Sequence, residues 1–241
     1  MRVCGEGRQH RETDLLFFTR MKPVALSVTL AFLLSLTACK TPVSTTRDNS
    51  TSSAKNAAVP TGTGFDYYLL NLSWSPEFCY SHPSAPKCAS HSTFVLHGLW
   101  PQNYDGTYPE NCSSAPGPSD PAAYKDIYPD QGLLQHEWHT HGTCSGLSAD
   151  AFLNTARRAY KSVTVPGKLE KLTHQTSMSP NQIMDLFMED NPRIPRESLA
   201  VSCGNNYLTA VEICLDKTLK PIQCGPIRAC RAVIIRIPPP S

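Results

Sequence analysis

The chain has 241 residues, of which 40% are apolar and 17% charged, and its formal net charge is +2 at pH 7. That length and apolar share support a domain with a hydrophobic core, and they exclude a disordered chain, a coiled coil and a collagen-like fibre. The small charge also excludes a protein that holds nucleic acid mainly through a basic surface.

Residues 1–39 have the layout of an export signal. An apolar run of 13 residues, Val24 to Leu36, follows Lys22 and precedes small residues. It is shorter than the roughly 20 residues that span a bilayer, and a positive start with a small-residue end is typical of a secretory signal. The end of the run resembles the lipobox of bacterial lipoproteins. It predicts a lipid anchor on Cys39, with ordinary cleavage after Ala38 as the alternative.

Residues 40–64 are predicted to form a flexible tether, because Ser, Thr, Ala, Asn and Pro dominate and no apolar period is present. We therefore expect an exported protein, either periplasmic or anchored to the outer membrane through Cys39, with an extracellular location as the alternative. Loss of residues 1–39 removes five of the 22 Lys and Arg residues and three of the 20 Asp and Glu residues. The mature chain then has 17 of each and is formally neutral.

Residues 65–241 are expected to form one domain of the α+β class. Aromatic and β-branched residues predict strands over residues 65–74, 92–96, 199–202, 207–215 and 232–237. Apolar spacing predicts helices over residues 132–144 and 149–161. Ser179 to Gln182 is a capping-box pattern that begins a further helix, which ends near Glu189. Strands and helices come in blocks, which predicts a mostly antiparallel central sheet with flanking helices.

Ten cysteines point to an oxidising compartment, because cytosolic thiols stay reduced. Eight of them lie in the domain, and an even number in an exported domain predicts four disulfides, although eight cysteines allow 105 pairings. Zinc is the alternative. It is disfavoured, because no C-x-x-C pair occurs and the spacings fit no common zinc site.

A first histidine segment covers residues 94–102. His97 is followed by Gly98 at the predicted end of a strand, where a side chain faces a cleft and the glycine lets a ligand approach the backbone. Trp100 is suited to stack on a flat ligand. The alternative for an isolated histidine is a half-buried strand residue beside a core tryptophan.

A second segment covers residues 136–144. On a helix Glu137 and His141 lie at i and i+4 and share a face, and a carboxylate beside an imidazole is a common arrangement for a general acid or base. The metal alternative uses His136, His139 and His141. Against it, Thr140 stands where a His-Glu-x-x-His zinc motif needs its second histidine, and His136 and His141 are expected to diverge.

Two separate imidazoles suit a reaction in which one group removes a proton and another donates one. Phosphodiester transfer by an internal hydroxyl is the obvious candidate, and it needs no cofactor if cationic groups meet the charge on phosphorus. Other hydrolases fit the same pair of roles.

The segments FVLHGLWPQ (94–102) and LQHEWHTHGTC (134–144) strongly resemble the two active-site segments of the ribonuclease T2 family. Its members include fungal acid ribonucleases, plant S-ribonucleases and bacterial ribonuclease I. The likeness extends to residues 74–79 and 207–216, so it covers nearly all of residues 65–237.

The resemblance implies an endoribonuclease that forms a 2′,3′-cyclic phosphate when the ribose 2′-hydroxyl attacks phosphorus and the 5′-oxygen leaves. His97 and His141 match the two catalytic histidines, and Glu137 matches the acidic residue that assists at the phosphate. DNA lacks the attacking hydroxyl and should survive.

The resemblance also assigns substrate contacts. His136 matches the histidine that helps to bind the phosphate, Trp100 matches the aromatic residue that stacks on a base, and Tyr108 is expected to share that base pocket. We also expect a monomer with no obligate protein partner and no cofactor. Its expected substrate is RNA, preferentially single-stranded.

The family further implies four disulfide pairs, Cys79–Cys88, Cys112–Cys144, Cys203–Cys230 and Cys214–Cys224. One position departs from the family, because Thr140 stands where the family usually has lysine just before the second catalytic histidine. Two other functions remain open: a metal-dependent hydrolase on the histidine cluster, and a catalytically weak RNA-binding surface lipoprotein.

Overall fold

The structure, a computed structural model, describes residues 64–84, 88 and 93–240. The predicted export signal, the anchor residue Cys39 and nearly all of the predicted tether lie outside these described residues. Within the described residues, no helix combines the length and the apolar character that crossing a membrane requires.

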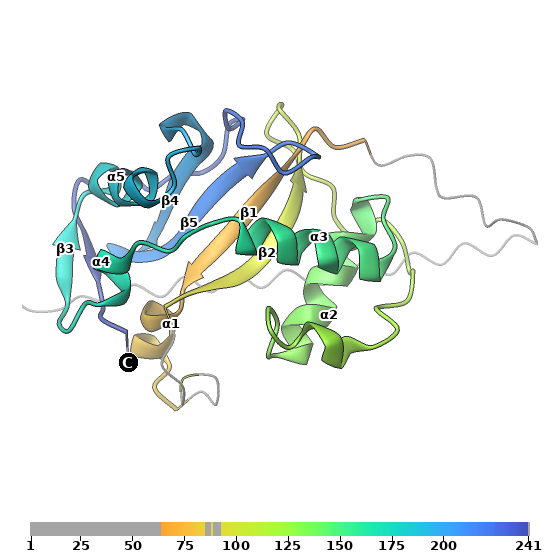
Figure 1. Cartoon of the computed structure of the whole chain (residues 1–241), viewed down its shortest axis with the longest axis horizontal. Coiled ribbons are helices and arrows are strands. Elements are labelled where there is room, and N and C mark those ends of the chain that lie inside the picture. Colours follow the sequence, from red (N-terminus) through yellow and green to blue (C-terminus); the bar gives the residue numbers. More distant parts are fainter. Residues whose placement is uncertain (1–63, 85–87, 89–92, 241) are drawn as a thin grey trace, which may run out of the picture. The chain divides into compact units, whose positions relative to one another are not determined.

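A six-stranded sheet forms the centre of the domain (Figure 1). Its strands are β1 Tyr67–Trp74, β2 Phe94–Gln102, β3 Thr176–Met178, β4 Leu199–Gly204, β5 Tyr207–Leu215 and β6 Ile235–Ile237. The strand order is β2-β1-β5-β6-β3, and β4 pairs with β5 away from this path. Every pairing is antiparallel except that of β5 with β6. The predicted α+β class with a mostly antiparallel sheet is therefore confirmed.

The helices are α1 Ser75–Ser81, α2 Gln131–Thr140, α3 Ala149–Lys161, α4 Gly167–Glu170 and α5 Pro180–Asp190. The predicted helix over residues 149–161 is confirmed at both ends. The capping box is also present, since the Gln182 backbone N–H donates to Ser179 Oγ and the Ser179 N–H donates to Gln182 Oε1. The short elements α1, α4 and β3 were not predicted, because too few residues carry their pattern.

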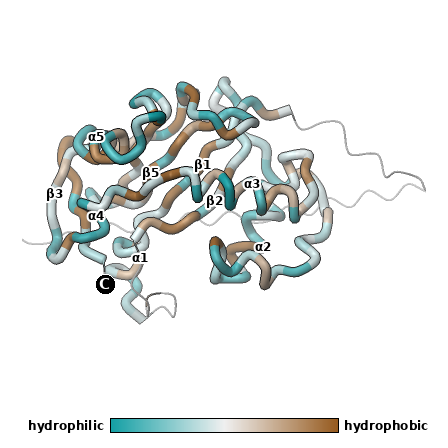
Figure 2. The backbone as a smooth tube through the Cα atoms, viewed as in Figure 1, coloured by the Kyte–Doolittle hydropathy of each residue, from teal (hydrophilic) through white to brown (hydrophobic). Residues whose placement is uncertain are grey.

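The two faces of the sheet carry different sets of side chains. Along β1 the side chains alternate, so Leu70, Leu72 and Trp74 enter the main core while Leu69 joins a smaller cluster on the opposite face. Helix α3 packs across β1 and β2, and α5 packs on β4 (Figure 1). Figure 2 shows how strongly hydrophobic residues concentrate along the central strands. The main core thus occupies one face, and the other carries a smaller apolar cluster together with polar residues.

Strand β2 is longer than the predicted strand over residues 92–96, which was expected to end at His97 and Gly98. It continues to Gln102, and Pro101 lies opposite Tyr68 within the pairing. A proline is tolerated here because β2 is the last strand of the sheet, where a backbone N–H can be absent. His97 therefore lies within the strand and not at its end.

The C-terminal strand is shorter than predicted, covering residues 235–237 instead of 232–237. Val233 and Ile234 are β-branched but exposed. Two disulfides tie the preceding segment to β4 and β5, and the segment does not extend β6 as a strand.

All four disulfides have the pairing that the family resemblance implied, Cys79–Cys88, Cys112–Cys144, Cys203–Cys230 and Cys214–Cys224. The last two fasten the segment after β5 to β4 and β5, and the Cys230 N–H donates to the Val201 carbonyl at 2.7 Å. This segment is thereby held beside the polar face of the sheet.

Candidate active site

His97 is placed by a β-bulge. The register passes from Asn71–Gly98 to Leu72–Leu96, so His97 is the additional residue of β2 at this point. The bulge turns Leu99 into the core and leaves His97 on the polar face. Ser73 Oγ lies 3.0 Å from His97 Nδ1, and 42% of the His97 side chain is exposed. The opposite nitrogen, Nε2, faces the residues that arrive from α2.

Glu137 projects from α2 into the site and is completely buried. Its Oε2 accepts a hydrogen bond of 2.8 Å from the Trp100 indole N–H. Its Oε1 lies 3.7 Å from His97 Nε2 and accepts no hydrogen bond from the residues that the structure describes. Burial raises the pKa of Glu137 to about 8, although the indole bond opposes the shift. The carboxyl is therefore protonated near neutral pH.

His141 follows the last residue of α2, and its backbone N–H donates to the Glu137 carbonyl at 3.1 Å. The predicted helix over residues 132–144 is thus wrong at its end, because α2 stops at Thr140 and a 3₁₀ turn follows from Gly142. The residue is 8% exposed. Burial first, and the charges of His136 and His97 next, lower the pKa of His141 to about 4. Its imidazole is neutral over most of the pH range.

The Trp100 ring lies close to both histidines. Its ring centroid is 5.3 Å from that of His97 and 5.2 Å from that of His141. Because its N–H holds the Glu137 carboxyl, the indole fixes the site in addition to lining it. The sequence predicted only a stacking surface, since no local pattern shows that the indole nitrogen meets residue 137.

Gly98 provides the space in which these groups meet. A Cβ atom built there would overlap both the Glu137 carboxyl and the Trp100 indole nitrogen. The predicted role of this glycine, to let a ligand approach the backbone, is replaced by close packing of the site's own side chains.

A cavity of about 710 Å³ opens beside His141 and Trp100. Tyr108, predicted to contact substrate, lines it and is 55% exposed. Glu212 also lines it and was not predicted. The sequence signal was a single acidic residue within an otherwise apolar strand, β5, which becomes meaningful only once the neighbouring strands are known.

The histidine cluster differs from the one considered as a metal site. Ligand atoms of His136, Glu137 and His141 lie within 4.8 Å of one another, whereas His139 is not part of this group. The expected divergence of His136 and His141 is wrong, because His141 lies beyond the regular helix and turns back toward the site. Among the described residues this is the one group that could hold a metal ion. One Glu137 oxygen already binds the indole.

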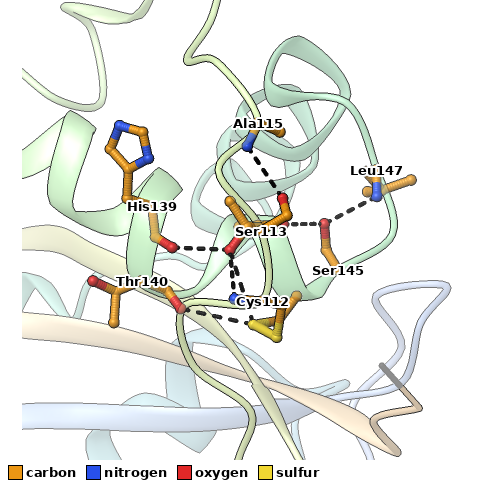
Figure 3. The surroundings of a disulfide bond; sticks show 10 residues. Cys112, Ser113, Ala115, His139, Thr140, Ser145 and Leu147 are labelled. Atoms are coloured by element: carbon orange, nitrogen blue, oxygen red, sulfur yellow. Dashed lines mark hydrogen bonds between the residues drawn. A yellow bond between two sulfur atoms is a disulfide. The ribbon is translucent and has the colours of Figure 1, made fainter. Parts of the chain in front are cut away.

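A disulfide holds the segment that follows α2 in place (Figure 3). Cys112 is joined to Cys144, and its backbone N–H donates to Thr143 Oγ1 at 3.2 Å, which in turn donates to the His139 carbonyl at 2.9 Å. The Asn111 N–H donates to the Thr140 carbonyl at 2.8 Å. Figure 3 shows the His139 ring pointing away from this crosslink. The position of His141 is therefore set by bonds on both sides of it.

Comparisons with known proteins agree on one family. The model of the Ribonuclease T2 family matches residues 65–224. A curated ribonuclease from Aeromonas hydrophila is 40% identical over 118 residues, which cover 48% of this chain and 54% of that protein. A relative from Haemophilus influenzae is 29% identical over 190 residues, 70% of this chain and 63% of its own length. The chain thus spans between half and two thirds of these two relatives.

Solved structures share the fold. An RNase-related protein from Calystegia sepium has a TM-score of 0.58 at 24% identity and covers 73% of this chain and 98% of its own. RNase NT, solved in complex with 5′-AMP, has a TM-score of 0.59 at 22% identity and covers 74% of this chain and 100% of its own.

The close packing at Gly98 can be tested by adding one methyl group. Gly98→Ala should lower the free energy of unfolding by about 1–3 kcal/mol, because the Glu137 carboxyl and the indole must move apart. Chemical denaturation measures this loss. Gly167→Ala is the control, since a Cβ there meets no atom within 4 Å and should cost no stability. Equal stabilities of the two variants would contradict the packing argument.

Proposed function

Because the chain belongs to the ribonuclease T2 family, we propose that it is an endoribonuclease that cleaves RNA by transphosphorylation without a metal cofactor. The observation that carries the proposal is the convergence of His97, from β2, with Glu137 and His141, from the end of α2. Glu137 Oε1 lies 3.7 Å from His97 Nε2, and the Trp100 ring centroid lies 5.3 Å from that of His97 and 5.2 Å from that of His141. Two imidazoles brought together in one site suit proton removal and proton donation at one phosphodiester.

His141 is the group suited to act as base. Its lowered pKa of about 4 keeps the ring neutral, so it can accept the proton of the ribose 2′-hydroxyl. The 2′-oxygen then attacks phosphorus. The bond from phosphorus to the 5′-oxygen breaks, and a 2′,3′-cyclic phosphate remains. His97, more exposed and next to Glu137, donates a proton to the leaving 5′-oxygen.

Glu137 is suited to assist at the phosphate as a neutral acid. A carboxylate would repel the phosphate oxygens, whereas a protonated carboxyl donates a hydrogen bond to them. Its pKa of about 8 supplies that protonated form at and below neutral pH. Burial of the carboxyl is therefore what makes an acidic residue compatible with an anionic substrate.

The substrate is single-stranded RNA. A base must be unpaired to stack on an aromatic side chain, and Trp100 and Tyr108 line the cavity next to His141. His136 is exposed beside His141, with ring centroids 6.1 Å apart, and is placed to meet a phosphate oxygen. Related structures were solved with 5′-AMP, 5′-UMP and 5′-GMP, which supports a nucleotide-binding site in this fold.

The protein is exported and acts as a monomer, either in the periplasm or anchored to the outer membrane through a lipid on Cys39. The support comes from the sequence of residues 24–39 and from four disulfides, which form in oxidising compartments.

The anchor is tested by Cys39→Ala in the full chain. This change removes the thiol that would carry the lipid, so the protein should move from the membrane fraction to the soluble fraction of the cells. Unchanged fractionation contradicts a lipid on this residue.

The function is tested by cleavage of single-stranded RNA with wild type, His97→Ala and His141→Ala, in EDTA. Wild type should cleave at full rate and leave 2′,3′-cyclic phosphate ends. Each variant should lose at least about 10²-fold in kcat, because proton transfer contributes 10²–10⁴. His174→Ala is a matched control, since it replaces an exposed histidine outside the site. Robust cleavage by both site variants, or full dependence on metal, would overturn the mechanism.

Activity should follow a bell-shaped curve in pH with its maximum under mildly acidic conditions. As pH rises through about 4, His141 loses its proton and becomes able to accept one, so kcat/KM rises. As pH rises toward about 8, Glu137 loses the proton with which it donates a hydrogen bond to the phosphate, so kcat/KM falls. Initial rates on RNA across this range check the curve. A rate that keeps rising through pH 9 would be incompatible with these roles.

Thr140 stands where the family usually has a lysine, and its hydroxyl lies 3.4 Å from His136 Nδ1. A hydroxyl brings no charge to the pentavalent phosphorus, and the loss of one such donor costs about 10²–10³ in rate elsewhere. Thr140→Lys should therefore raise kcat markedly. Thr173→Lys adds the same charge away from the site and should change nothing. An unaltered kcat in Thr140→Lys counts against a charge requirement here.

A further inference from the structure

A buried polar pair lies on the site face of the sheet. Asn71 on β1 is opposite Gly98 on one side and Glu212 of β5 on the other. Asn71 Nδ2 donates to Glu212 Oε1 at 3.0 Å, and the two residues are 5% and 7% exposed. The pair therefore adjoins the strand position at which the catalytic groups meet.

This pair is not explained by stability. Taking a carboxyl and an amide out of water is unfavourable, and apolar residues would fill the same strands without that cost. The pKa of Glu212 is raised by burial, while hydrogen bonds from Ser202 and Asn71 oppose the shift. Asn71 Oδ1 is buried and accepts no hydrogen bond from the described residues. The pair thus retains capacity for further hydrogen bonds.

The cavity beside the catalytic residues leads to this pair. His141 and Trp100 line it together with Glu212 of β5 and Ser202 of β4. Its volume of about 710 Å³ is ample for a nucleobase, since small-molecule sites measure about 300–1,000 Å³. A base stacked on the indole next to the scissile phosphate would direct an edge toward Glu212.

We propose that Glu212, held in place by Asn71, selects the base in this cavity and favours guanine. The inference rests on the proposed ribonuclease function. A carboxylate offers about four acceptor positions, of which Asn71 and Ser202 use two. Guanine presents two adjacent donors, N1–H and the N2 amino group, that match the two carboxylate oxygens. Adenine and cytosine present one donor beside an acceptor, and uracil presents one donor between two acceptors.

Asn71 is a positioning residue in this scheme. Its amide turns one carboxylate oxygen of Glu212 toward β1 and fixes the plane of the carboxyl. Loss of that bond should weaken the base preference, with less effect on the rate for a poorly matched base.

The test compares kcat/KM on the full set of dinucleoside monophosphates for wild type, Glu212→Gln and Asn71→Ser, with Tm recorded for each. Wild type should prefer guanine at one side of the cleaved bond by about tenfold or more, the size expected for a bidentate contact. Glu212→Gln keeps the shape but replaces one acceptor by a donor, so the preference should disappear while cleavage at adenine persists. Asn71→Ser should reduce the preference for guanine in part. Glu170→Gln, an exposed acid on α4, should leave it unchanged.

A second measurement needs no variant. Wild type should bind 5′-GMP at least about tenfold more tightly than 5′-AMP in calorimetry, by the same bidentate contact. Equal affinities, absence of a guanine preference in wild type, or an unaltered preference in Glu212→Gln overturns the assignment of Glu212. In those cases RNA is still cleaved. Failure of wild type to cleave any RNA would instead overturn the proposed function itself.

Discussion

The hydrogen bond from Trp100 to Glu137 is the contact on which the site depends. It joins the edge strand β2 to helix α2 across 37 residues of sequence, at a distance of 2.8 Å. It forms only because residue 98 has no side chain, since any Cβ would occupy the place where the two groups meet. With this bond made, the carboxyl is set beside His97, and the helix end brings His141 next to the indole.

Burial shifts the pKa values of two groups in this site in opposite directions. Loss of water disfavours the charged form of every ionisable group, so it raises the pKa of Glu137 and lowers that of His141. A protonated carboxyl and a neutral imidazole are thereby present at one pH, as the proposed mechanism requires. The more exposed His97 keeps contact with solvent.

Much of this arrangement follows from the sequence, and the exceptions have physical causes. Helix α3, the capping box at Ser179 and strand β5 could be predicted, because local periodicity and capping determine them. The grouping of His97, Glu137 and His141 came from the family resemblance and from helical spacing. The β-bulge, the indole bond and the Asn71–Glu212 pair could not be predicted, because each depends on which strands become neighbours. The disulfide pairing likewise came from resemblance, since eight cysteines alone leave the pairing open.

The Cys112–Cys144 crosslink has a consequence for where the protein can work. It fastens the segment that follows α2, so the placing of His141 depends on a bond that forms only in an oxidising environment. In the cytosol, where thiols stay reduced, the same chain would lack this fastening while it is still surrounded by the RNA of the cell that makes it. If the protein is exported, as we propose, oxidation would complete the site only after the chain has left that cytosol. A bond with no part in the chemistry would in this way protect the producing cell.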